Sequence, residues 1–390
     1  MEMPEGQSYS GQRQAEIFCH GGQYVLKRIL AEIFNHGPRP AEPGEFTRRA
    51  FLAGRIDLAR AEAVADLIAS KTEFSYNSAK NNLIGKLSGQ IEMIRNRVIE
   101  LLAEIEANID HPEEDIESSD QNIMTNELSQ IINEIGELAD SYRSGRIIRE
   151  GFKIAIAGRP NAGKSSLFNL LLNQNRAIVA PIPGTTRDYL TEWIDLDGIA
   201  VSITDTAGLR KSNGIIERAG QKSATDIMNN SDLILWMVDI TRGSWKRDLK
   251  KDLTKIPNRV KILLFNKIDK CEKINLLNIG RIDDRLEGVK FSCVTKAGFR
   301  ELRKEMISHI NCQMPDLTDA LVITSERHKK KFNNALKYLK RAIAGFKRND
   351  TPELISFEIR LGINEIDEIT GRVYNEDILD SIFSRFCIGK

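Results

Sequence analysis

A glycine-rich segment near the middle of the 390-residue chain has the residue types that bind a phosphate chain. It reads Gly158-Arg159-Pro160-Asn161-Ala162-Gly163-Lys164-Ser165-Ser166, between an apolar run and a helix-like run. A glycine-rich backbone can wrap a phosphate, and the N–H groups that open the following helix donate to it. In this G-x-x-x-x-G-K-S pattern we expect Lys164 to reach the β- and γ-phosphates and Ser165 to bind Mg²⁺. The segment therefore predicts a nucleoside triphosphate site.

Three further polar motifs each follow an apolar run that is predicted to be a strand. In Asp205-Thr206-Ala207-Gly208 the carboxylate can hold Mg²⁺ through water, and the last N–H can lie near a γ-phosphate. In Asn266-Lys267-Ile268-Asp269 the final carboxylate can accept from N1–H and the exocyclic amine of guanine, a donor pair that adenine lacks. The backbone of Ser292-Cys293-Val294 is expected near the guanine carbonyl. Together the four motifs predict that the nucleotide is GTP.

The loop between the first two motifs is expected to be a switch that senses the γ-phosphate. It contains Pro181-Ile182-Pro183-Gly184-Thr185-Thr186, and Thr186 would complete the coordination of Mg²⁺. Leu209 stands where many GTPases have a glutamine that orients the attacking water, and leucine has no hydrogen-bonding group. Another residue must hold the water, and the candidates are Arg210, Lys211, Asn213, Glu217 and Arg218.

Apolar strands alternate with helices through the middle of the chain, which is typical of an α/β domain. The predicted strands are Phe152–Ala157, Val201–Thr204, Asp232–Val238, Val260–Phe265 and Val289–Cys293. This alternation predicts a doubly wound, mostly parallel sheet with ligands at the carboxyl ends of its strands. All four motifs lie at such ends.

The flanking segments are helical and are expected to fold together as one discontinuous bundle around the inserted α/β domain. Apolar residues recur every three or four positions, and the two stripes contain Leu87, Ile91, Ile94, Val98, Leu101 and Ile105, then Leu128, Ile131, Ile135, Leu138 and Tyr142. Further helices are predicted over Phe332–Phe346, Glu353–Leu361 and Asn375–Phe386. The sequence of residues 1–53 indicates a partial α+β domain, with a strand at Ala15–Gly22 and a helix at Tyr24–Phe34. The predicted domains are 1–53, 54–150, 151–311 and 312–390.

The composition excludes several classes of protein. A formal net charge of +1 means that any nucleic-acid surface must be a local patch. Five scattered cysteines without C-x-x-C spacing argue against a disulfide framework or a zinc site. No apolar run approaches the roughly 20 residues of a membrane span, and the N-terminus does not read as a signal peptide. We therefore expect a cytoplasmic protein without membrane contact.

With their flanks, these motifs resemble the MnmE or TrmE family of bacterial and organellar tRNA-uridine-modification GTPases. The resemblance runs from about Pro4 to Lys390, with only part of the family's N-terminal folate-binding domain. Beyond the nucleotide motifs it rests on His20–Gly22, Pro43–Leu52, Asp57–Ala63 and the C-terminal Phe386-Cys387-Ile388-Gly389-Lys390.

The resemblance implies a K⁺-activated GTP hydrolase whose G domains dimerise. Asn161 would bind K⁺ through its side chain, together with Thr185 and the carbonyls of Ala180 and Ile182. Glu217 matches the glutamate that orients water in the family, and it would act in catalysis with Lys164 and Thr186. The implied GTP contacts cover Asn161–Ser166, Ala180–Thr186, Asp205–Gly208, Asn266, Lys267, Asp269 and Ser292–Val294.

The resemblance also implies partners and a further cofactor. With an FAD-dependent subunit, the family adds an aminomethyl or carboxymethylaminomethyl group at C5 of the wobble uridine, U34, of tRNA. The one-carbon unit comes from 5-formyl- or methylene-tetrahydrofolate, for which Glu16, Arg55 and Lys390 are the implied contacts. Cys387 aligns with a cysteine near the modification site, and the N-terminal domain contributes to a homodimer.

Two other readings of the sequence remain open. The first is a GTP-gated RNA-binding or ribosome-assembly switch, which would need a basic, aromatic-rich surface. The second is a truncated relative that binds and hydrolyses GTP without supporting modification.

Overall fold

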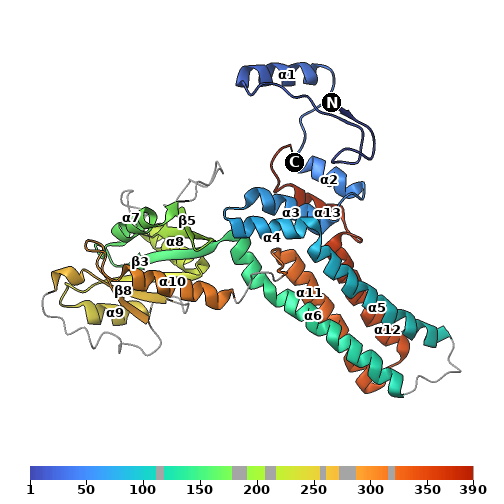
Figure 1. Cartoon of the computed structure of the whole chain (residues 1–390). Coiled ribbons are helices and arrows are strands. Elements are labelled where there is room, and N and C mark those ends of the chain that lie inside the picture. The colour runs from blue at the N-terminus through green and yellow to red at the C-terminus, as the bar shows by residue number, and fades with distance from the viewer. Residues whose placement is uncertain are drawn as a thin grey trace. The chain divides into compact units, whose positions relative to one another are not determined.

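The computed structural model describes residues 1–110, 118–177, 191–206, 217–254, 261–271, 287–314 and 321–389 (Figure 1). The chain forms two compact units. The first comprises Met1–Ser70, Tyr76–Gly145 and Leu321–Lys390, and the second comprises Lys71–Ser75 and Arg146–Ala320. The second unit is therefore inserted in the sequence of the first, as the predicted fold class requires.

The second unit contains a seven-stranded, mostly parallel sheet in the order β4-β5-β6-β3-β7-β8-β9. Parallel pairing joins β6, β3, β7, β8 and β9, whereas β5 pairs antiparallel with both β4 and β6. The strand bounds are Phe152–Gly158 (β3), Arg176–Ala177 (β4), Thr191–Leu196 (β5), Ile199–Asp205 (β6), Leu233–Asp239 (β7), Lys261–Asn266 (β8) and Glu287–Lys290 (β9). The five predicted strands are present, with ends that differ by at most three residues.

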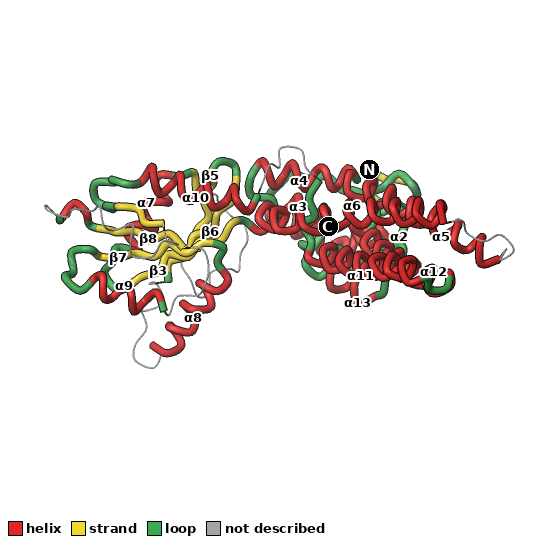
Figure 2. Tube along the Cα trace, turned by 90° about the horizontal axis from the view of Figure 1, so that it is seen from below, coloured by secondary structure: helices red, strands yellow, loops and turns green. Residues whose placement is uncertain are grey.

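Helices surround this sheet, as the tube in Figure 2 shows. They are α7 (Lys164–Gln174), α8 (Glu217–Asn230), α9 (Trp245–Leu253), the short 3-10 helix η2 (Ile268–Lys270) and α10 (Phe299–Gln313). The central strands are apolar without alternation, and Ile154, Ile156, Leu233 and Leu235 are almost fully buried. This pattern is typical of parallel strands that are covered on both faces.

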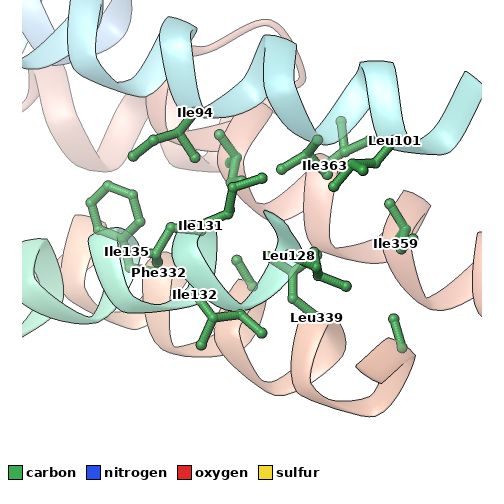
Figure 3. Packing of buried hydrophobic residues seen from close by; sticks show 14 of the residues in the cluster. Ile94, Leu101, Leu128, Ile131, Ile132, Ile135, Phe332, Leu339, Ile359 and Ile363 are labelled. Carbon is green, nitrogen blue, oxygen red and sulfur yellow. The ribbon is translucent and has the colours of Figure 1, made fainter. Parts of the chain in front are cut away.

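The first unit is dominated by long helices whose apolar stripes share one core (Figure 3). Its helices are α3 (Leu58–Ala69), α4 (Glu73–Ile84), α5 (Lys86–Asp110), α6 (Ser118–Glu150), α11 (Glu326–Arg348), α12 (Pro352–Thr370) and α13 (Glu376–Phe383). Ile94 of α5 and Ile131 of α6 pack in the same cluster as Phe332 of α11 and Ile363 of α12. Helices from both sides of the insertion thus form a single bundle, as predicted.

A close backbone contact joins α6 to the segment before α11. The Ile323 N–H donates to Ser141 Oγ at 3.1 Å. A Cβ atom added at Gly145 would lie 2.0 Å from the Ile323 carbonyl oxygen, which is far inside van der Waals contact. Glycine is therefore needed at this position, where α6 and the returning chain touch.

The N-terminal part of the first unit is small and largely exposed. Strands β1 (Glu2–Met3) and β2 (Gln14–Ala15) pair antiparallel, followed by α1 (Gln23–Asn35) and α2 (Glu45–Leu52). The predicted strand over Ala15–Gly22 is wrong, because only Ala15 is in a strand. Since β1 has only two residues, the ladder ends after Glu16 N–H bonds to the Met1 carbonyl. The predicted helix over Tyr24–Phe34 is confirmed as α1.

No helix in the described parts of the chain combines the length and the apolar content that a membrane span needs.

Candidate GTP-binding site

The phosphate loop connects β3 to α7 through backbone that only glycine tolerates at two positions. Gly158 and Gly163 have φ angles of 137° and 107°, and Asn161 also has a positive φ, of 62°. A Cβ at Gly158 would lie 2.4 Å from the Met237 carbonyl oxygen, and one at Gly163 would lie 2.3 Å from Asn266 Nδ2. The glycines of the motif are therefore required by close approach as well as by conformation.

Lys164 is buried at the start of α7 and is held by its own loop. Its ammonium group donates to the carbonyl oxygens of Gly158 at 3.0 Å and of Arg159 at 2.9 Å. The side chain therefore folds back over the loop, which places its charge where the loop would receive phosphates.

Ser165 and Asp205, which are both predicted to lie beside Mg²⁺, are in contact although they are 40 residues apart in sequence. Ser165 Oγ donates to Asp205 Oδ2 at 2.9 Å, across the parallel pair β3–β6. A hydroxyl and a carboxylate are the oxygen ligands that Mg²⁺ prefers. The pair thus fits a divalent cation beside the phosphate loop.

Asn266, at the end of β8, links the phosphate loop to the loop that follows β9. Its Nδ2 donates to the Ala162 carbonyl at 2.7 Å, and its Oδ1 accepts from the Cys293 N–H at 3.2 Å. The side chain is almost completely buried. Asn266 therefore fixes the distance between the loop that would hold phosphates and the loop after β9.

Asp269 is oriented by a serine of the last motif. Ser292 Oγ donates to Asp269 Oδ1 at 2.5 Å and accepts from the backbone N–H groups of Val294 and Thr295. The carboxylate is therefore held at the carboxyl edge of the sheet, next to the Cys293 backbone. The two motifs that are predicted to bind guanine therefore lie next to each other.

Lys267 joins the phosphate loop to Asp239, a carboxylate that is not among the predicted site residues. Its ammonium donates to Asp239 Oδ2 at 2.6 Å and to the Asn161 carbonyl at 2.9 Å. Burial of Asp239 opposes its ionisation, but hydrogen bonds from Lys267 and Thr241 keep its pKa below the usual value. Asp239 ends strand β7, so its position at a strand end was a signal that could have found it.

The Cys293 thiol is partly buried beside the phosphate loop. Burial raises its pKa to about 11, so the thiol is neutral near pH 7. Its Sγ donates weakly to the Gly163 carbonyl at 3.8 Å.

Arg159 anchors the phosphate loop to α9, a contact that no local sequence pattern indicates. Its guanidinium binds both carboxylate oxygens of Asp252, at 2.8 and 2.9 Å, and lies 3.1 Å from Asp248 Oδ2. The two aspartates are four residues apart and so share one face of the helix. The Arg159 carbonyl meanwhile accepts from Lys164.

Several predicted site residues lie outside the described residues, namely Ala180–Thr186, Ala207, Gly208 and Lys390. The same holds for Leu209 and for the side chains of Glu217 and Arg218, although the backbone of both is described in α8. Of the remaining nucleotide residues, Thr206 Oγ1 donates to the Ile156 carbonyl at 2.9 Å, and Ser166 and Val294 are exposed.

The residues implied for folate lie in the first unit. Arg55 donates to the Gly6 carbonyl at 2.8 Å and lines a cavity of about 800 Å³ with Phe51, Arg60, Arg372 and Tyr374. Glu16 accepts from Gln14 at 3.4 Å, and no described bond joins it to Arg55. Cys387 is exposed, and its carbonyl accepts from the Gly44 N–H at 3.5 Å. The Pro43–Leu52 motif and the C-terminal motif are therefore neighbours.

Comparison with known proteins identifies the family. A family model for the MnmE helical domain matches residues 58–387, and one for the N-terminus of the GTP-binding protein TrmE matches residues 1–55. The chain is 40% identical over 383 residues to the tRNA modification GTPase MnmE of Natranaerobius thermophilus, covering 98% of this chain and 83% of that protein. The chain belongs to the MnmE family.

Other MnmE proteins are similarly close. The MnmE of Acetivibrio thermocellus is 39% identical over 393 residues, covering 100% of this chain and 84% of that protein. Among solved structures, the G domain of the FeoB iron transporter of T. maritima is 25% identical, covers 40% of this chain and 98% of that chain, and gives a TM-score of 0.32. The family resemblance that the motifs predicted is confirmed.

Proposed function

We propose that this MnmE-family chain binds GTP with Mg²⁺, hydrolyses it, and serves tRNA modification through that hydrolysis. The observation that carries the proposal is the network around Asn266, which joins the phosphate loop to the Asp269–Ser292–Cys293 edge. A nucleotide has its base and its phosphates at opposite ends, so its site needs both halves at a fixed distance. Family membership supplies the reaction class.

We propose separate roles for the residues at the two ends of the nucleotide. Lys164 would exchange its carbonyl partners for oxygens of the β- and γ-phosphates, and Ser165 and Asp205 would hold Mg²⁺. Bound Mg²⁺ neutralises charge on the phosphates as the γ-phosphoryl group is transferred. Asp269 accepts from two guanine donors, and Ser292 keeps that carboxylate in place.

We further propose that K⁺ activates hydrolysis, with Asn161, Ala180, Ile182 and Thr185 as its ligands. Asn161 supports this because its backbone is fixed at φ 62° and its carbonyl is held by Lys267, so its side chain projects from a set position. A cation there would offset charge on the reacting phosphates. Glu217 would orient the attacking water, and Thr186 would complete the coordination of Mg²⁺.

We propose the complete tRNA modification reaction from membership of the MnmE family. The chain would act with an FAD-dependent subunit at C5 of U34, as a homodimer formed by its G domains and its N-terminal domain. Glu16, Arg55 and Lys390 would bind a tetrahydrofolate, and Cys387 would lie near the modification site. The exposure of Cys387 and its position beside the Pro43–Leu52 motif are compatible with that role.

Substitution of Asp269 tests the nucleotide assignment. In Asp269→Asn one acceptor is replaced by an amide donor, which clashes with the guanine amine but suits the C2 carbonyl of xanthine. We expect affinity for GTP to fall at least 100-fold, since buried polar groups are left unpaired, and turnover to recover with XTP. Titration with fluorescent GDP and XDP measures the affinities, and phosphate release from GTP and XTP measures the turnover. Unchanged GDP affinity would contradict the guanine site.

Two assays test the rest of the proposal. GTP turnover is compared in K⁺ and in Na⁺, with Asn161→Ala as the variant that should lose the difference. Equal rates in both salts would reject the K⁺ site. Nucleoside mass spectrometry of tRNA from complemented cells tests modification, and GTP turnover without restored modification would favour the truncated relative.

A further inference from the structure

Helix α11 carries a dense cationic face on the first unit. Its exposed cations are Lys329, Lys330, Lys337, Lys340, Arg341, Lys347 and Arg348. At about 100° per residue, these seven side chains fall within an arc of about 120°. The only carboxylate in the sequence of the helix is Glu326, in its first turn. We call these seven residues the cationic face.

The opposite side of α11 is fully used by the bundle. Phe332, Leu339 and Phe346 are buried, and Figure 3 shows Phe332 and Leu339 turned into the shared core. The helix is therefore fixed, and the cationic face is displayed along about 28 Å, at 1.5 Å per residue.

Most of the cationic face is not neutralised within the unit. Arg341 lies 3.8 Å from Glu358, and Arg348 pairs with Asp350. Among the described residues no carboxylate pairs with the five lysines of the face, of which Lys329 lies over the Tyr142 ring. By contrast, Lys331 on the flank binds Glu365 and Glu368 of α12. In a chain of net charge +1, this is a strong local excess of positive charge.

We propose that the cationic face of α11 binds the sugar-phosphate backbone of the tRNA substrate. This inference rests on the proposed function, because it names a surface for that substrate. A nucleic-acid helix carries a dense line of phosphates, and a rigid row of lysines can neutralise several of them with release of counterions. The contact reads no bases and positions the RNA.

The geometry favours RNA over a lipid surface. Helices that lie on membranes insert an exposed apolar face between the lipids, whereas the apolar face of α11 is buried. Asn333, exposed within the same arc, adds a side-chain donor suited to phosphate or ribose oxygens. An acidic protein partner is a separate outcome of the test below.

The test compares two triple variants of the full-length chain. Lys330→Gln/Lys337→Gln/Lys340→Gln removes three charges from the cationic face. Lys80→Gln/Lys86→Gln/Lys304→Gln removes three exposed lysines from other helices and is the matched control. Glutamine and lysine have similar helix propensity, so folding should be retained. Anisotropy of labelled unmodified tRNA is measured from 50 to 300 mM KCl, with vesicles rich in anionic lipid and polyglutamate as competitors.

We expect the face variant to bind tRNA at least tenfold more weakly at low salt. The slope of log K against log salt should decrease in magnitude by about two, and the control should match the unaltered chain. Equal slopes for all three proteins overturn the proposal, as do undetectable tRNA binding by the unaltered chain and displacement by vesicles or polyglutamate at equal charge. GTP turnover is measured in the same samples, and its retention shows that GTP hydrolysis stands even where the cationic face fails.

Discussion

At the scale of single residues, replacing Arg159 tests whether its ion pairs with α9 hold the phosphate loop in place. Its side chain is more than one-third exposed, so the ion pairs with Asp248 and Asp252 are partly screened by solvent. In Arg159→Gln we expect GTP affinity to fall about three- to fivefold, because the loop carbonyl that receives Lys164 loses its anchor. Fluorescent nucleotide titration measures this.

Three further variants serve as controls for the Arg159 test. Asp252→Asn should cause a loss of similar size, and the double variant should lose less than the sum of the two. Arg247→Gln removes an exposed cation from α9 itself and should leave affinity unchanged. A full additive loss in the double variant would refute the anchoring role.

The lowered pKa of Glu62 should make the stability of the first unit depend on pH. Burial opposes its ionisation, but His328 and Arg327 lower its pKa well below the ordinary 4.5. His328 Nε2 and Arg327 Nε each lie 2.8 Å from a Glu62 carboxylate oxygen. A depressed pKa means that the stabilisation is complete above about pH 4.5 and is lost as pH falls below that value.

The variant Glu62→Gln should therefore be less stable by about 3 kcal/mol at pH 7, since it leaves the largely buried Arg327 guanidinium without its carboxylate partner. Its free energy of unfolding should also decline less steeply than that of the unaltered chain between pH 4.5 and 3. Urea titrations followed by far-UV circular dichroism measure both. Parallel pH profiles would show that Glu62 does not carry the dependence.

At the scale of helices and strands, Gly145 tests the contact between α6 and the returning chain. Gly145→Ala forces a Cβ to within 2.0 Å of the Ile323 carbonyl oxygen, so backbone must move. We expect a loss of about 1–3 kcal/mol. Gly136→Ala, on the same helix with open space around it, should gain up to about 1 kcal/mol. Urea unfolding compares them, and a stabilising Gly145→Ala would contradict the packing.

The sequence predicted elements well where a pattern is local and less well where it depends on distant pairing. The β3, β6 and β8 strands are apolar runs that end in predicted polar motifs, so both strands and motifs were readable, whereas Asp239 at the end of the equally apolar β7 was not singled out. Strand β5 was missed although Asp197-Gly198 marks its hairpin with β6, with φ angles of 54° and 85°. Residues 17–22 have strand-like composition, but no described strand pairs with them, and composition alone cannot supply a partner strand.

Predictions for single site residues divide in the same way. Ser165, Asp205 and Asp269 belong to motifs with fixed places at strand ends, so their proximity followed from the sheet. The pairing of Arg159 with α9, and that of Lys267 with Asp239, join positions up to 93 residues apart. No spacing rule connects such positions, and only the fold brings them together.

At the scale of the whole molecule, the two units can be observed separately. The three tryptophans, Trp193, Trp236 and Trp245, all lie in the second unit. GDP with Mg²⁺ at 100 times its dissociation constant should stabilise that unit by about 2.7 kcal/mol. The tryptophan-detected transition should then rise by roughly 5–10 °C, while the helix-rich first unit, followed by circular dichroism, keeps its transition. Equal shifts in both signals would instead show a single cooperative block.

The shared core of the bundle has a consequence for how this chain is made. About 175 residues separate α6 from α11, so the ribosome finishes α5 and α6 long before the helices that cover them. At a synthesis rate of 5–20 residues per second, the apolar stripes of α5 and α6 stay uncovered by α11 and α12 for roughly 10–35 s. The GTPase sequence emerges during that wait and has its own core, so it can fold first. Nascent chains stalled before residue 326 should therefore be bound by chaperones through α5 and α6, and release should coincide with synthesis of the last 65 or so residues.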